Sequence, residues 1–175
     1  FDGNNHTISN IYINSSRNYQ GLFGYNKGNI YNVNINGNIV SSGERIGAIV
    51  GEASGGNIIN CHSDTYIKGY QLVGGIIGLG GSNIYRCSNT AEIYATYANS
   101  GGISGNHNGY IEECYNKGYI HSASSTAGGI IGWQANGNTV NCYNRGKIET
   151  PRLSGGIAGG AGMTGYHTVY VRNCY

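Results

Sequence analysis

Apolar and polar positions recur along this chain with a fixed period. A motif of a small residue, an apolar residue, a variable residue and glycine occurs six times, as GLFG, AIVG, GIIG, GISG, GIIG and GIAG. Its last residues are Gly24, Gly51, Gly78, Gly105, Gly132 and Gly159, so each step is 27 residues. A period of about 20 to 50 residues is typical of repeat architectures, in which one structural unit stacks on the next.

Three further columns of the repeat are apolar. The first contains Val33, Cys61, Cys87, Cys114 and Cys142. Six residues later in each repeat stand Ile39, Ile67, Ile93, Ile120 and Ile148. Three residues before the first column stand Ile30, Ile58, Ile84 and Ile111, followed by Thr139. Short alternating stretches between glycine- and asparagine-rich turns predict strands whose inward side chains stack on their equivalents in the next repeat.

This pattern predicts an all-β protein, a right-handed parallel β-helix (β-solenoid) of about six to seven coils of 27 residues, with three short strands per coil. GGIIG, NIYRC and AEIYA are the candidate strands of one coil. Successive coils would lie about 4.8 Å apart, and the right hand is expected because crossovers between parallel strands nearly always take it. Composition agrees, since 32 glycines, 16 tyrosines and only 10% charged residues leave few residues that favour helices.

Glycine and asparagine mark the corners of each coil. Glycine reaches positive φ and allows backbones to approach closely because it has no Cβ, and asparagine tolerates the same conformation better than most residues. One asparagine column contains Asn89, Asn116 and Asn144, and another contains Asn32, Asn60 and Asn141. We expect these side-chain amides to hydrogen-bond from coil to coil, as stacked asparagines do in other parallel β-structures.

We expect a single β-solenoid domain over residues 1–175. Residues 1–20 would form a lead-in coil, residues 21–160 the regular 27-residue repeats and residues 161–175 an irregular last coil. The last coil is irregular because Cys174 lies fifteen residues after Gly159, which predicts a loop inserted around Ala161–Gly165. The chain begins without methionine and stops within a repeat, so we interpret it as a fragment of a larger protein whose flanking domains cap the stack.

Several runs of the chain resemble a known repeat. GGIIGWQANGNTVNCYNRGKI and GGISGNHNGYIEECYNKGYI are similar to the GLUG repeat, a glycine-rich motif of bacterial surface proteins and of the non-catalytic parts of immunoglobulin A protease-like proteins. The opening FDGNNHTISNIYIN resembles the lead-in that commonly precedes such repeats. The resemblance implies a secreted or cell-surface bacterial protein. It carries no catalytic residue with it, since the sequence has no HExxH motif.

The cysteines allow two interpretations. Five cysteines in a secreted chain usually suggest a disulfide framework with one left over. All but Cys174 instead fall in one inward column, which suits a small side chain that is commonly buried. Stacked parallel side chains rarely give the dihedral angle that a disulfide needs. We therefore expect free buried thiols, with a disulfide between adjacent coils as the alternative. No CxxC pair is present, and we expect no metal site and no cofactor.

The acidic residues bear on a possible enzyme activity. Parallel β-helices include polysaccharide lyases and glycoside hydrolases, which need carboxylates clustered on one face. Only Glu112 and Glu113 are close in sequence, and neighbours on a strand point to opposite faces. Asp64, Glu92 and Glu149 lie in three different columns. We therefore expect no catalytic residues and interpret the acids as solvated charges that oppose lateral association.

Tyrosine is the abundant residue with the potential to bind a partner. Tyr115, Tyr143 and Tyr175 directly follow their cysteines, which predicts one outward column, and Tyr66 and Tyr119 share another. Flat rings at regular spacing could stack on sugar rings or on a protein partner. Alternatively, the rings would stack only on one another and stabilise the coil, because tyrosine has a high β-propensity.

Charge and hydropathy limit the classes of partner that this chain is expected to bind. The net charge is +2 and the ten lysines and arginines are scattered, which argues against a nucleic-acid partner. No apolar run approaches the roughly 18 to 20 residues that span a bilayer, so we expect no membrane insertion of this segment. The resulting hypothesis is a non-enzymatic module that acts as a structural stalk or as an adhesive surface for a host or matrix glycan or protein. A carbohydrate-active β-helix enzyme and an accessory region of a large secreted protease are the alternatives.

Overall fold

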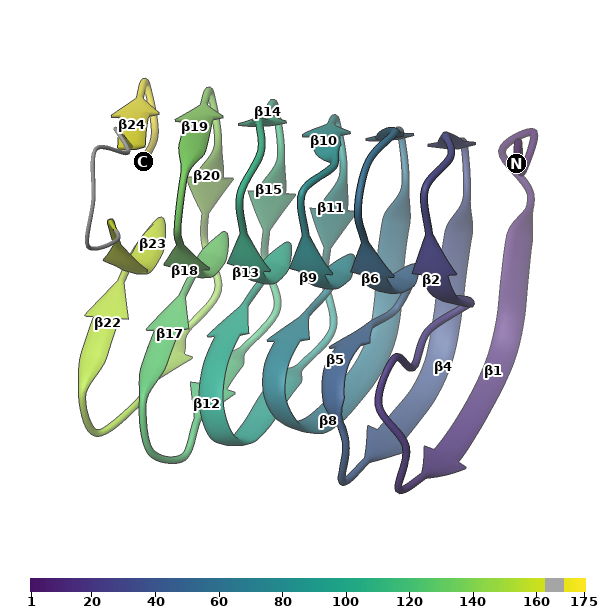
Figure 1. Cartoon of the computed structure of the whole chain (residues 1–175), viewed down its shortest axis with the longest axis horizontal. Coiled ribbons are helices and arrows are strands. Elements are labelled where there is room, and N and C mark those ends of the chain that lie inside the picture. Colours follow the sequence, from purple (N-terminus) through teal and green to yellow (C-terminus); the bar gives the residue numbers. More distant parts are fainter. Residues whose placement is uncertain (163–168) are drawn as a thin grey trace.

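The computed structural model describes residues 1–162 and 169–175, none of which form a helix of the length and apolar character that crossing a membrane requires. Figure 1 shows a stack of coils with the two termini at opposite ends. Every strand pairing is parallel, and equivalent residues such as Ile67, Ile93 and Ile120 pair from one coil to the next. In Figure 1 the chain rises on the near face and descends on the far face as it advances, the sense of a right-handed coil. The predicted parallel β-solenoid is confirmed.

Three sheets run along the stack. The first sheet carries the glycine motif and consists of β2 (Phe23–Asn26), β6 (Val50–Ala53), β9 (Ile77–Gly80), β13 (Ser104–His107), β18 (Ile131–Gln134) and β23 (Ala158–Ala161). The second sheet consists of β3 (Ile30–Tyr31), β7 (Asn57–Ile59), β10 (Asn83–Tyr85), β14 (Ile111–Glu112), β19 (Gly137–Val140) and β24 (Val169–Arg172).

The third sheet, called the long sheet below, has twelve strands. They are β1 (Thr7–Ser15), β4 (Asn34–Ser41), β5 (Glu44–Gly47), β8 (His62–Gly74), β11 (Ser88–Asn89), β12 (Ile93–Gly101), β15 (Tyr115–Asn116), β16 (Ile120–Ser122), β17 (Thr126–Gly128), β20 (Tyr143–Asn144), β21 (Ile148–Glu149) and β22 (Leu153–Gly155). In Figure 1, β8 and β12 bend around the lower end of the coil. The predicted three strands per coil thus correspond to three sheets, and the long sheet contributes two or three separate strands in most coils.

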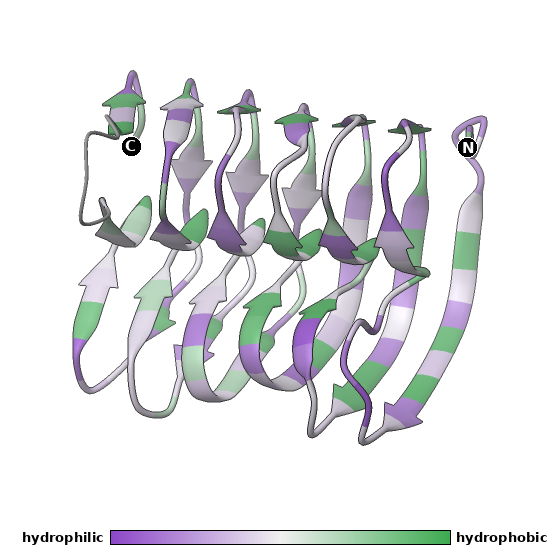
Figure 2. Ribbon diagram, viewed as in Figure 1, coloured by the Kyte–Doolittle hydropathy of each residue, from purple (hydrophilic) through white to green (hydrophobic). Residues whose placement is uncertain are grey.

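The predicted apolar columns form the core. Ile39, Ile67, Ile93 and Ile120 are each 0% exposed, whereas Ile148, in the last strand of its column, is only partly buried. Figure 2 shows the underlying alternation of hydrophobic and hydrophilic residues along β1 and β4. Burial of a side chain of this size stabilises the fold by about 1.5–3 kcal/mol. The repetition of isoleucine in one column therefore gives each coil a similar contribution to stability.

A ladder of asparagine amides lies beside the apolar core, as predicted. The Nδ2 of Asn89 donates to Oδ1 of Asn116 at 2.9 Å, and Nδ2 of Asn116 donates to Oδ1 of Asn144 at 2.8 Å. Each amide also donates to a backbone carbonyl two residues later, that of Gly118 for Asn116. Because an amide both donates and accepts, Asn116 bonds to a neighbour on each side, whereas Oδ1 of Asn89, the first member of the ladder, has no hydrogen-bond partner. Asn89 and Asn116 are fully buried, so the ladder is part of the interior.

The second asparagine column forms a corner of the coil. Asn32, Asn60 and Asn141 have φ angles of 55°, 54° and 54°, and the same corner is occupied by Arg86 and Glu113 in other coils. Asparagine adopts this left-handed conformation at low cost, which explains its recurrence here. Glu113 therefore leaves the strand at the corner, so the expectation that Glu112 and Glu113 point to opposite faces of one strand is wrong.

The last coil keeps the register despite its longer spacing. The backbone N–H of Cys142 contacts Sγ of Cys174 at 3.4 Å, the distance at which Cys114 N–H contacts Sγ of Cys142. Cys174 therefore continues the cysteine column, although the sequence placed it outside. The insertion predicted around Ala161–Gly165 lies largely outside the described residues, and the two sides of it, β23 and β24, pair with the preceding coil as usual.

In three successive coils a glycine packs against the asparagine ladder. A Cβ on Gly102 would lie 2.2 Å from the carbonyl oxygen of Gly129 and 2.4 Å from Cγ of Asn116. Gly75 and Gly129 occupy the same column and meet the same obstruction, whereas a Cβ on Gly156, also in this column, would have no atom within 4 Å. The absence of a side chain is therefore required at the three positions beside the asparagine ladder, whereas Ala48 occupies this column in an earlier coil and Gly156 has open space around it.

We predict that Gly102→Ala destabilises the fold by about 1–3 kcal/mol or more, because the added methyl group forces a backbone carbonyl or the asparagine ladder to move. The matched control Gly156→Ala should stay within about 0.5 kcal/mol of the wild type. Urea denaturation followed by circular dichroism measures both. Equal stabilities of the two variants would contradict the tight packing at Gly102.

Candidate functional site

The tyrosine column lies on the outer side of the long sheet. Tyr115 and Tyr143 stack with their ring centroids 5.1 Å apart and their planes 7° apart, and Tyr143 and Tyr175 stack at 5.5 Å and 10°. The cation of Lys117 lies 5.2 Å from the Tyr115 ring centroid, and that of Arg145 lies 5.6 Å from the Tyr143 ring centroid. We call these five residues the tyrosine face. The predicted column of three tyrosines is therefore present as a continuous ladder.

Stacking changes what the tyrosine face can offer to a ligand. Tyr143 has a ring on each side, so neither of its flat faces is open to a sugar ring. The parts of Tyr143 that remain for a ligand are its ring edge and its hydroxyl group. Hydroxyl groups and exposed cations in neighbouring coils, about 4.8 Å apart, can donate hydrogen bonds to an extended polar ligand.

Tyr66 and Tyr119 share an outward column but do not touch, because they are two coils apart with Glu92 between them. Burial and the charge of Glu92 raise the pKa of Tyr66. The Tyr119 hydroxyl donates to Oε2 of Glu149 at 2.8 Å, and burial together with this hydrogen bond raises the pKa of Tyr119. Lys147 contacts the same carboxylate oxygen at 2.8 Å. Both tyrosines therefore stay protonated and can act as hydrogen-bond donors.

Two further stacked pairs were missed by the sequence analysis. The rings of Tyr94 and His121 stack at 4.3 Å, and the cation of Lys68 lies 5.3 Å from the Tyr94 ring centroid. Tyr70 and Tyr97 stack at 5.0 Å with their planes 7° apart. Each pair is 27 residues apart, so the repeat period would have found both if it had been applied to all aromatic residues.

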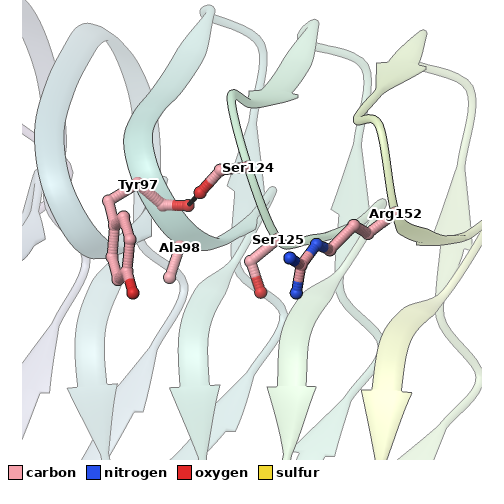
Figure 3. Close-up of a pocket in the computed structure, with 5 residues that line it drawn as sticks. All are labelled: Tyr97, Ala98, Ser124, Ser125 and Arg152. Carbon is pink, nitrogen blue, oxygen red and sulfur yellow. Dashed lines mark hydrogen bonds between the residues drawn. The ribbon is translucent and has the colours of Figure 1, made fainter.

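A cavity of about 260 Å³ lies where the long sheet bends, and it was also missed. Figure 3 shows its lining, which is Tyr97, Ala98, Ser124, Ser125 and Arg152. These residues come from three successive coils. Because Tyr97 and Arg152 are 55 residues apart in the sequence, or 152 minus 97, no local motif brings them together.

The cysteines form an interior ladder with little reactivity. Cys61, Cys87, Cys114 and Cys142 are at most 1% exposed, and all five cysteines including Cys174 are free. Each backbone N–H of the column contacts the sulfur of the next coil, for example Cys87 N–H to Cys114 Sγ at 3.3 Å. Burial raises the pKa of the Cys87 thiol. Because all four thiols are enclosed, no substrate reaches them, and the column packs the core.

One acid and one histidine meet at the Tyr119 hydroxyl group, which lies 2.8 Å from Oε2 of Glu149 and 3.2 Å from Nδ1 of His121. Residues 1–162 and 169–175 contain no group of three or more His, Cys, Asp or Glu side chains that could hold a metal ion. The strand registers place Asp64, Glu92 and Glu149 in three different outward columns, as the sequence indicates. His167 lies outside the described residues.

His107 is the one histidine inside the core of the described coils. It is 0% exposed, and neither ring nitrogen forms a well-aligned hydrogen bond. Burial lowers the pKa of His107 to about 4, and nearby backbone groups of Ser82 and Tyr110 oppose this shift only in part. Gln134 holds the same position one coil later. The imidazole is therefore kept neutral in the folded chain.

The His107 pKa predicts a loss of stability in acid. Above pH 6.5, the ordinary value for histidine, the side chain is neutral in both the folded and the unfolded chain. As the pH falls from 6.5 to about 4, the unfolded chain binds a proton that the folded chain does not, so stability decreases. Below about pH 4 both states are protonated and this contribution no longer changes. A shift of this size corresponds to a loss of about 3 kcal/mol.

Urea denaturation of the wild type and of His107→Gln across this pH range measures the loss. The variant removes the titrating group and keeps a side chain that the same column already accommodates at Gln134. The wild type should lose about 3 kcal/mol more than the variant. Parallel pH profiles would show that the imidazole is not buried in its neutral form.

The tyrosine ladder predicts a separate effect on stability. Tyr143→Ala removes two stacked ring pairs, each worth about 0.5–1.5 kcal/mol, and should destabilise the fold by about 1–3 kcal/mol. Tyr12→Ala is the control, because Tyr12 is 73% exposed on β1 of the same sheet. Thermal or urea unfolding compares them. An equal, small effect of both substitutions would show that the ladder contributes nothing to the fold.

Comparison with known proteins extends the description of the fold. No protein-family model matches the sequence, and no curated protein matches it. Among solved structures, the chain is similar to the crystal structure of a candidate immunoglobulin A1 protease from Bacteroides ovatus, with a TM-score of 0.81 and 24% identity over the whole of this chain. The chain spans 59% of the length of that protein. At this level of identity, the two proteins are shown to share the fold.

Proposed function

We propose that this chain is a non-enzymatic repeat module of a larger secreted or cell-surface bacterial protein and that it presents the tyrosine face to a host or matrix glycan or protein. The observation that carries the proposal is the outward ladder of Tyr115, Tyr143 and Tyr175 with its flanking cations. The cysteines and the buried asparagines are already engaged with their equivalents in the next coil. The exposed columns of the long sheet are what this module offers to a partner.

The chemistry of the tyrosine face favours a polar, extended ligand. Tyrosine combines a rigid ring with a hydroxyl group and loses little conformational entropy on binding. The ladder already holds the rings of Tyr115 and Tyr143 in place, so a ligand would not have to order them. Lys117 and Arg145 are exposed and add positive charge beside the hydroxyl groups. A hydroxyl-rich glycan or an acidic protein segment matches this combination.

Two resemblances support the wider setting proposed for the module. The GLUG repeat, which this sequence resembles, occurs in bacterial surface proteins and in non-catalytic parts of immunoglobulin A protease-like proteins. The structural neighbour bears the name of a candidate immunoglobulin A1 protease and is longer than this chain. An accessory region of a large secreted protease is therefore the second candidate, in which flanking domains of the same chain carry out the chemistry. The separated positions of Asp64, Glu92 and Glu149 give no support to a carbohydrate-active enzyme.

The binding proposal is tested on a glycan and matrix-protein array. We predict that the double variant Tyr115→Phe, Tyr143→Phe binds its strongest ligand about 5- to 100-fold more weakly, because two hydrogen bonds are lost while the stacked rings remain. Tyr12→Phe, an exposed tyrosine far from the ladder, is the matched control. Unchanged binding by the double variant would leave the ladder with a structural role alone.

A polysaccharide panel tests the non-enzymatic part of the proposal. No turnover is expected from the wild-type chain. Turnover that is abolished by Glu112→Gln or by Glu113→Gln would overturn the proposal and establish a carbohydrate-active enzyme. Asp64→Asn serves as the control, because Asp64 is an exposed carboxylate on another sheet of the same coil stack.

A further inference from the structure

At the bend of the long sheet, a tyrosine ring that is stacked on only one side borders a cavity. Tyr97 stacks on Tyr70 on one side, at 5.0 Å and 7°. One coil later, 27 residues on, the chain carries Ser124, which has no ring to continue the stack. The Ser124 hydroxyl donates to the Tyr97 carbonyl oxygen and is thereby held against the backbone. Tyr97 is 50% exposed, and Figure 3 shows its ring at one end of the cavity.

A cationic side chain, that of Arg152, lies at the opposite end of the cavity. Arg152 stands two coils after Tyr97, and Figure 3 shows its guanidinium group turned back toward Ser125. It is exposed, and within the described ranges of the chain it makes no ion pair. A guanidinium group binds a carboxylate with two parallel hydrogen bonds. The charge of Arg152 is therefore available to an anionic group in the cavity.

The spacing of the coils limits the thickness of a ligand that fits between Tyr97 and Arg152. Two coil steps separate Tyr97 from Arg152 by roughly 9.6 Å along the stack. A ring in van der Waals contact with Tyr97 lies roughly 4 Å from it, which leaves room for a carboxylate to meet the guanidinium group. The floor consists of Ala98 and Ser125, and no hydrogen bond occupies the Ser125 hydroxyl in the described part of the chain. A cavity of about 260 Å³ is large enough for one sugar residue and too small for a folded segment.

We propose that this cavity, named here the Tyr97–Arg152 slot, binds one sugar residue that carries a carboxylate. The sugar ring stacks on the open face of Tyr97, the carboxylate pairs with Arg152, and Ser125 hydrogen-bonds a ring hydroxyl group. Stacking on an aromatic face suits the C–H surface of a sugar ring, and the single cation selects acidic over neutral sugars. The slot adds a second site to the proposed binding module and does not use any residue of the tyrosine face.

The test is a titration of the ¹⁵N-labelled chain with an oligosaccharide of uronic acid and with the matched neutral oligosaccharide, followed by amide chemical shifts. The acidic sugar should shift the amides of Ala98, Ser124 and Ser125 and bind about 10-fold more tightly than the neutral sugar. An aromatic carboxylic acid is the third probe, because an aromatic ring with a carboxylate would fit the same two ends. Tighter binding of that probe than of the acidic sugar would overturn the sugar assignment.

Variants separate the two ends of the slot. Arg152→Gln should weaken the acidic sugar about 10-fold or more and leave the neutral sugar unchanged. Tyr97→Leu should weaken both sugars, and Tyr97→Phe should weaken neither by more than about 2-fold, because only the ring face is used. Arg86→Gln is the control, since Arg86 is an exposed arginine just after β10, at the other end of the coil. Circular dichroism confirms that each variant is folded.

The outcomes distinguish this proposal from the previous one. Equal binding of acidic and neutral sugars, or an unchanged affinity in Arg152→Gln, would overturn the slot and leave the tyrosine face untouched. Amide chemical-shift changes at Tyr115 and Tyr143, without changes at the slot, would also overturn the slot proposal. Conversely, a ligand lost in Tyr97→Leu but retained in the phenylalanine double variant would support the slot and count against the tyrosine face.

Discussion

Parallel pairing of each coil with the next is the constraint on which the rest of the structure depends. It places every side chain about 4.8 Å from its equivalent in the neighbouring coil, so each interior column must tolerate copies of itself. Isoleucine does so by packing, and the asparagine amide does so because it both donates and accepts hydrogen bonds. Lysine, aspartate and glutamate are missing from the buried residues of the described coils. A stacked column of like charges would repel along its whole length.

The same constraint acts on the backbone. The glycine column that includes Gly102 must leave room for a carbonyl oxygen of the next coil and for the asparagine ladder. The corner column that includes Asn60 must turn with a positive φ in every coil. Arg86 and Glu113 adopt the same angle where asparagine is absent. The surrounding hydrogen bonds of the stack therefore impose this conformation even on residues that adopt it at a cost.

The surface that this fold offers to a ligand depends on whether an outward column of side chains continues or is interrupted. Stacking in a ladder covers both flat faces of an inner member such as Tyr143, which keeps only its ring edge and its hydroxyl group for a partner. The interruption of a ladder has the opposite effect. Ser124 follows Tyr97 in its column and leaves one ring face open beside Arg152. Both proposed sites thus arise from one rule, the first where a column continues and the second where it stops.

The sequence by itself determined the 27-residue period, the parallel coils, the inward isoleucine and cysteine columns and the outward position of Tyr115, Tyr143 and Tyr175. These follow from local alternation and from identical residues at fixed spacing, which any coil satisfies in the same way. The sequence placed Cys174 outside the column, because counting residues through an insertion cannot show that the strand after it returns to register.

Only the tertiary structure decided which surfaces are open. The covered faces of Tyr143, the neutral state of buried His107 and the meeting of Tyr97 with Arg152 depend on side chains from neighbouring coils. Such contacts run along the stack between residues that are far apart in sequence. The physical reason is that a column specifies where a side chain points, whereas its exposure depends on the size of the residues one coil before and one coil after it.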